Sequence, residues 1–153
     1  MIVNRQSQVR VSIQGLNKFL RSVIKRLRLP ADGLTICFVG NAEMARWNRT
    51  YRGKKRPTDV LSFPADAARG ARRNGHQAGR RRANLSARDY LGDIAIAPVV
   101  ARQNARRFGR SFDEEMRILI LHGVLHLIGY DHETDSGQME RFERRLRREW
   151  RIG

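Results

Sequence analysis

One segment constrains the possible folds of this chain more than any other segment does. Residues 118–128 read Ile-Leu-Ile-Leu-His-Gly-Val-Leu-His-Leu-Ile, which is apolar on nearly every side of a helix. A helix of that kind is buried. Ser111 and Glu114, three residues apart, match a capping box, and Gly129 is suited to end the helix. We therefore predict a buried helix over residues 111–128.

The rest of the chain alternates between short β-branched runs and segments of helical periodicity. Ser12 and Asn41 are the expected N-caps of two helices, Pro98 suits a first helical turn, and Pro64 is expected to stop a strand. This pattern predicts an α/β (α+β) fold of four strands and five helices. The predicted strands cover residues 2–4, 34–39, 59–63 and 91–97, and the predicted helices 12–28, 41–51, 98–108, 111–128 and 137–150.

The length of 153 residues fits a single domain over 1–153. Residues 67–88 differ from the rest, because they hold seven arginines and three glycines but no acidic residue or hydrophobic period. We interpret them as a mobile surface loop that interrupts the domain. The loop could grip RNA, or it could be an insertion without a function.

The formal net charge of +16 favours an anionic partner, with nucleic acid first, although a solvated basic surface would give the same composition. The single cysteine, Cys37, lies in an apolar run and is expected to be a core thiol. No apolar run is long enough to cross a membrane, and the first residues do not resemble a secretory signal. A cytoplasmic location is the resulting expectation.

Three of the four histidines fall within eleven residues. His122 and His126 are four apart, which places both rings on one face of the predicted helix, about 5–6 Å apart at Cβ. After a chain reversal at Gly129, His132 can reach the same point. Three neutral imidazoles with an open fourth position are typical of a catalytic zinc site, here one ion per chain. Hydrogen-bonded core histidines are the alternative, but burying two imidazoles without partners would cost a few kcal/mol.

Gly123 stands where the His-Glu-x-x-His helix of zinc peptidases has its general base. This disfavours the peptidase mechanism while it keeps the spacing of the ligands. We also expect the missing side chain to leave room near the metal for a bulky substrate.

Three segments together resemble the YbeY family of bacterial metal-dependent endoribonucleases. They are His122-Gly-Val-Leu-His126-Leu-Ile-Gly-Tyr-Asp-His132, the stretch from Asn48 through Arg52 and Pro57 to Pro64, and Leu91-Gly-Asp-Ile94. The resemblance implies a small mixed sheet with helices packed on it, a zinc site of His122, His126 and His132, and Arg52 as the functional arginine. It also implies cleavage of single-stranded RNA in 16S rRNA 3′-end maturation and ribosome quality control, with small-subunit ribosomal proteins as partners.

Phosphodiester cleavage builds negative charge on the phosphoryl oxygens, and a guanidinium such as that of Arg52 can match it with two hydrogen bonds. The sequence leaves the identity of the general base open. Asp131 and Glu133 flank the third histidine and could act as the base or orient an imidazole, or the 2′-hydroxyl of the RNA could attack. Two other functions are alternatives: a zinc metallopeptidase-like hydrolase, and a non-catalytic rRNA-binding assembly factor whose metal is structural.

Overall fold

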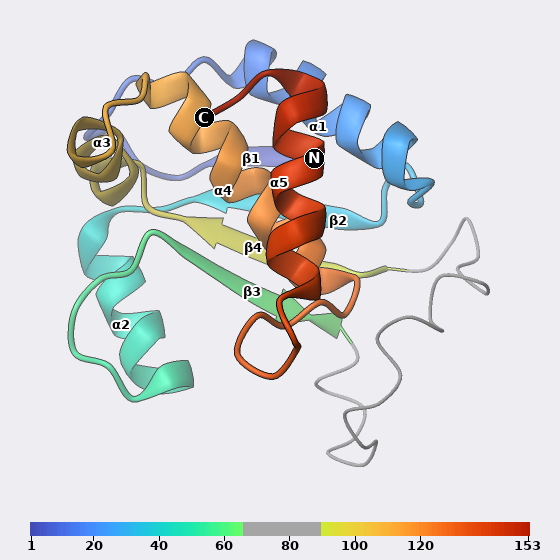
Figure 1. Ribbon diagram of the computed structural model, residues 1–153. Coiled ribbons are helices and arrows are strands. Elements are labelled where there is room, and N and C mark those ends of the chain that lie inside the picture. Colours follow the sequence, from blue (N-terminus) through green and yellow to red (C-terminus); the bar gives the residue numbers. More distant parts are fainter. Residues whose placement is uncertain (66–89) are drawn as a thin grey trace.

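A computed structural model describes residues 1–65 and 90–153, and the arginine-rich loop expected at 67–88 lies outside these described residues. Every predicted element is present within two residues of its expected bounds (Figure 1). The elements are β1 (Ile2–Asn4), α1 (Ile13–Leu27), β2 (Leu34–Phe38), α2 (Asn41–Arg52), β3 (Val60–Pro64), β4 (Gly92–Ile96), α3 (Pro98–Arg107), α4 (Phe112–Leu127) and α5 (Gln138–Trp150).

The four strands form one mixed sheet in the order β1-β2-β4-β3, which confirms the expected α+β class. β1, β2 and β4 are parallel, and β3 is antiparallel to β4. β3 ends at Pro64, but Pro64 is itself the last residue of the strand, because it pairs with Gly92 at the edge of the sheet, where a proline without an N–H is tolerated. Gly92 has a φ of +138°, and a Cβ there would lie 2.1 Å from the carbonyl oxygen of Phe63. Only glycine fits this pairing.

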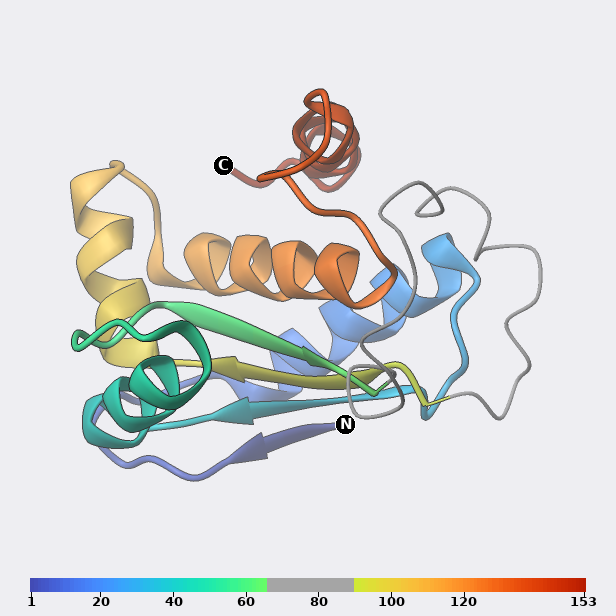
Figure 2. The same cartoon turned by 90° about the horizontal axis from the view of Figure 1, so that it is seen from below.

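Alternate residues of the strands point to opposite faces of the sheet. On one face, Ile36 of β2 and Ile94 of β4 join the large core built with α1 and α4. Figure 2 shows α4 lying over this face, with α5 outside it. α4 is thus covered on several sides, as its apolar sequence predicts. None of the helices in residues 1–65 and 90–153 combines the length and the apolar character needed to span a bilayer.

The opposite face of the sheet packs against α2. Leu61 and Ala95 form a second, smaller core with Met44 of α2, and Phe63 and Cys37 pack at its edge. Burial raises the pKa of the Cys37 thiol, which agrees with a packing role for this side chain. α2 is held by this face, so its C-terminal end is placed beside β3.

The predicted capping box of Ser111 and Glu114 at the start of α4 is confirmed. The Ser111 side chain accepts a hydrogen bond from the Glu114 N–H, and the Glu114 carboxylate accepts one from the Ser111 N–H. Pro98 occupies the first turn of α3 as expected. Ser12 makes no side-chain cap, and Asn41 is already helical, with Gly40 at the N-cap position. Exposed N–H groups at a helix start can bond to water, so a side-chain cap is optional there.

Gly123 is the point of close approach between α4 and the sheet. A Cβ on Gly123 would lie 2.8 Å from Cγ2 of Ile94, and the Gly123 carbonyl accepts a hydrogen bond from the Ser62 hydroxyl at 3.2 Å. The expectation that Gly123 leaves room for substrate was wrong, because Ile94 fills that space. The missing side chain lets the helix pack closely on β4 and β3.

We predict that Gly123→Ala lowers the free energy of unfolding by about 1–3 kcal/mol, since overpacking in a core costs that much and exceeds the gain in helix propensity. Gly15→Ala in α1 is the matched control: its Cβ would meet only the flexible Ser12 side chain, at 3.2 Å. This control is expected to be neutral or slightly stabilising. Urea unfolding of both variants measures the difference, and an unchanged Gly123→Ala midpoint would contradict the packing argument.

Candidate metal centre

Three histidines converge at the C-terminal end of α4. The Nε2 atoms of His122 and His126 lie 3.2 Å apart, and their ring centroids 4.7 Å. The ring of His132 lies 5.4 Å from that of His122 and 5.1 Å from that of His126. One ligand nitrogen from each of the three residues falls within 4.8 Å of the others. The structure therefore brings together all three histidines that the sequence predicted.

The chemistry of this cluster fits a metal ion. Nitrogens bound to one tetrahedral zinc at 2.0–2.1 Å lie about 3.3 Å from each other. The 3.2 Å separation of the first two Nε2 atoms matches this value. Burial, and then repulsion from the other two imidazoles, lower the pKa of His126. A neutral ring at neutral pH is the form that ligates a metal.

The loop after α4 carries His132 to the other two rings. Gly129 has a φ of +100°, which ends the helix and turns the chain. The Asp131 carboxylate accepts hydrogen bonds from the Glu133 N–H and the Thr134 hydroxyl, each at 3.0 Å. The first of these bonds is the main cause of the lowered pKa of Asp131. Asp131, one of the two carboxylates considered as general base or orienting group, thus orders the loop.

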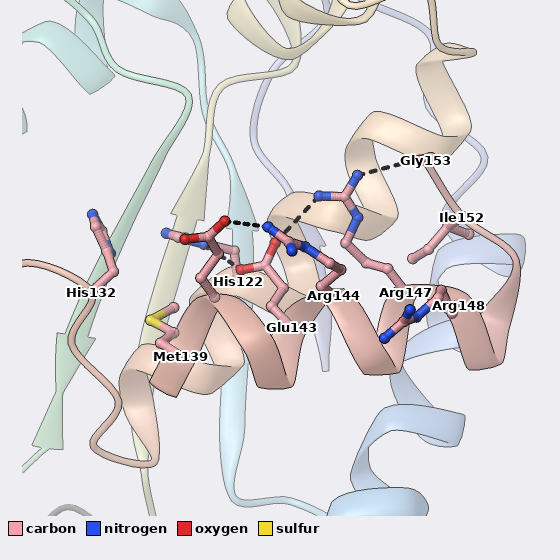
Figure 3. A pocket seen from close by; sticks show the side chains of 10 residues that line it. His122, His132, Met139, Glu143, Arg144, Arg147, Arg148, Ile152 and Gly153 are labelled. Atoms are coloured by element: carbon pink, nitrogen blue, oxygen red, sulfur yellow. Dashed lines mark hydrogen bonds and ion pairs between the residues drawn. The ribbon is translucent and has the colours of Figure 1, made fainter. Parts of the chain in front are cut away.

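Glu143 is the site residue that sequence reasoning missed. The i,i+4 spacing of Glu143 and Arg147 is typical of an ion pair on a solvated helix face, but the Glu143 side chain is only 13% exposed. Its Oε2 lies 2.8 Å from Nδ1 of His122, and its Oε1 lies 3.8 Å from Arg147, which in turn donates to the backbone oxygen of Gly153 (Figure 3). A signal was available, because Glu143 follows the buried Met139 by four residues and so shares its face.

This contact gives His122 a defined orientation. An imidazole that donates its Nδ1–H to a carboxylate leaves the Nε2 lone pair for a metal, and such partners commonly accompany metal-binding histidines. In His122 it is Nε2 that faces His126. Glu143 therefore holds the ring in the orientation that the cluster requires.

Arg52 lies beside the loop that carries His132. It is the last residue of α2, and its Nη2 lies 3.5 Å from Oε1 of Glu133, a carboxylate that is 66% exposed. Arg52 lines the same cavity as the three histidines. This α2–β3 cavity, of about 1060 Å³, is bounded by the end of α2, by residues 58–64 and by the loop that carries His132.

The protein is thus an α+β protein with a mixed four-stranded sheet. Its candidate metal centre consists of three histidines that converge at the end of a buried helix. The family described as "Endoribonuclease YbeY" matches residues 1–151, and the chain belongs to this family.

Similar proteins cover most of the chain. Proteins named "Endoribonuclease YbeY" from Koribacter versatilis and Solibacter usitatus are each 39% identical to it, over 96% and 86% of this chain and 83% and 75% of their own. The solution structure of TM1509 from Thermotoga maritima superposes with a TM-score of 0.58 at 26% identity. That superposition covers 99% of this chain and 92% of the other.

We predict that Glu143→Gln weakens metal binding about 10- to 100-fold, because loss of a partner that orients a ligating imidazole has an effect of this size. Glu140→Gln is the matched control, since Glu140 is on the same helix but is 68% exposed and pairs with Arg144. Titration of the metal-free variants with Zn²⁺ or Co²⁺ measures the affinity. Equal affinities for the two variants would show that the contact with His122 does not serve metal binding.

Proposed function

We propose that this protein is a zinc-dependent endoribonuclease that cleaves single-stranded RNA. The observation that carries the proposal is the convergence of His122, His126 and His132 in one open cavity with Arg52. Membership of the YbeY family supports the reaction class. The substrate that we propose is 16S rRNA during 3′-end maturation and ribosome quality control, in the cytoplasm and with small-subunit ribosomal proteins as partners.

His122, His126 and His132 would hold the ion, one per chain. Three imidazoles that line an open cavity leave a coordination position free for a reactant, as catalytic zinc sites do. When bound, zinc supplies Lewis acidity toward a phosphoryl oxygen and lowers the pKa of coordinated water to about 7. Glu143 would keep the ring of His122 aimed at the ion.

Arg52 is proposed to bind the phosphate at the cleavage site. Its present partner, Glu133, lies 3.5 Å away and both side chains are largely exposed, so this ion pair is weak. A phosphate that enters the cavity can replace Glu133 and accept two hydrogen bonds from the guanidinium. The chain's net charge of +16 favours the approach of a polyanion.

The position of Gly123 argues against the peptidase alternative. In zinc peptidases the residue after the first histidine supplies the general base. Here a side chain at that position would meet Ile94 in the core rather than the cavity. The non-catalytic alternative, in which the metal is structural, is distinguished by the next experiment.

We predict that His126→Ala folds but loses stoichiometric zinc and loses at least about 100-fold in cleavage rate, since the ion contributes several kcal/mol to catalysis. Circular dichroism checks the fold, elemental analysis the metal, and cleavage of a labelled single-stranded RNA the activity. The wild type treated with a chelator serves as the control and should lose activity in the same way. A variant that unfolds, together with a wild type that shows no metal-dependent cleavage, would favour the structural role.

For Arg52 we predict a 10²- to 10³-fold loss of cleavage rate in Arg52→Ala, the range found when one charge-stabilising donor is removed. Arg52→Lys should restore little, because an ammonium cannot form the paired hydrogen bonds of a guanidinium. Arg49→Ala is the matched control: Arg49 is exposed on the same last turn but does not line the cavity. Similar losses at residues 49 and 52 would indicate a general effect of charge.

A further inference from the structure

The three histidines do not lie at the end of a blind pocket. Besides the α2–β3 cavity, a second cavity of about 590 Å³ opens beside α5 and is also lined by His122 and His132. Figure 3 shows Arg144, Arg147 and Arg148 on α5, on the side of His122 away from His132. We call this the α5 cavity. The two cavities share His122 and His132, so a ligand that extended from one cavity to the other would cross the candidate metal centre.

The exposed end of the α2–β3 cavity carries an aromatic ring. Tyr51 is 66% exposed, more than any other large aromatic side chain among the described residues. Its ring packs edge-on against Phe63 at a centroid distance of 4.9 Å, and Phe63 packs against Trp47 at 6.0 Å. The ring is thus supported from below while much of it stays accessible. Tyr51 also lines the cavity that holds the three histidines.

The arginines that line the α5 cavity differ in whether they already have an ion-pair partner. Arg147 is engaged by Glu143 and Gly153, and Arg144 is paired with Glu140. Arg148 is exposed and lines the cavity, and no carboxylate among residues 1–65 and 90–153 forms an ion pair with it. It is the arginine of this cavity that can take up a phosphate without losing an ion pair with a described residue.

We propose that a single RNA strand crosses the three histidines from one cavity to the other, with a base stacked on Tyr51 and a backbone phosphate on Arg148. This inference rests on the proposed function and deepens it by assigning the path of the substrate. Aromatic rings bind bases of single strands by stacking, and cations follow the backbone. A duplex keeps its bases stacked on one another, so the platform also provides a reason for the preference for single strands.

Binding of a short 2′-O-methyl RNA, of roughly ten nucleotides, tests the path without relying on cleavage. Fluorescence anisotropy gives the affinity of the full chain, and a gel confirms that the probe stays intact. Each base in turn is replaced by an abasic site. In the wild type, an abasic site at one position should lower the affinity for the probe about 5- to 100-fold, which is the effect of removing one stacked base. In Tyr51→Ala that position should lose its effect, while Tyr51→Phe should keep it.

The salt dependence of binding tests the other cavity. Arg148→Ala should lower the slope of log affinity against log salt concentration by about 0.7, the value for one contact to a single-stranded phosphate. Arg145→Ala is the matched control, since Arg145 is exposed on α5 and stacks on Phe142 but does not line the cavity. Phe108→Ala is the control for Tyr51, because Phe108 is 53% exposed and lines neither cavity.

The path is overturned if no abasic position depends on Tyr51, if Arg145→Ala changes the slope as much as Arg148→Ala, or if the wild type does not bind the probe at low salt. These results are separate from those that test the proposed function. A wild type that cleaves RNA with metal while both variants bind normally would refute the path alone. A wild type that binds along this path but never cleaves would refute the nuclease and leave the path standing.

Discussion

The close packing of α4 against the sheet is the interaction on which the rest of the structure depends. At Gly123 the helix has no side chain, and Ile94 of β4 occupies the space. α1, α3 and α5 also contact α4, so its axis and rotation are fixed by the core. A metal site requires its ligands to be held within about half an ångström of their working positions. A buried, rigid helix meets this requirement for His122 and His126.

The other groups of the site come from elements that reach the end of α4 from different directions. The loop that begins at Gly129 supplies His132, and α5 supplies Glu143, which contacts His122. α2 supplies Arg52 from the opposite side of the cavity. Glu143 is nearly buried, and its carboxylate is satisfied by an imidazole on one oxygen and a guanidinium on the other. Such an arrangement is what makes a buried charge tolerable.

Much of the fold followed from local patterns. Helical and strand periods placed all nine described elements, and the reciprocal cap at Ser111 was confirmed because both of its bonds form within four residues. The errors concern features that depend on neighbours in space. Strand β3 ends one residue later than expected, at Pro64 itself, because β3 lies at the sheet edge, and Gly123 faces Ile94 because of how the helix is rotated on the sheet. Neither fact can be read from the flanking residues.

The sequence by itself determined that two imidazoles four residues apart share a helix face and that a glycine turn can return a third one to them, because helix geometry and glycine conformation act over short distances. Only the tertiary structure decided which groups surround them. Glu143 meets His122 across 21 residues, and Arg52 meets Glu133 across 81. Tyr51 stands beside the same cavity because α2 packs on the far face of the sheet. Such contacts depend on how whole elements pack: the local pattern places Glu143 on the inner face of α5, but it does not specify the contact with His122.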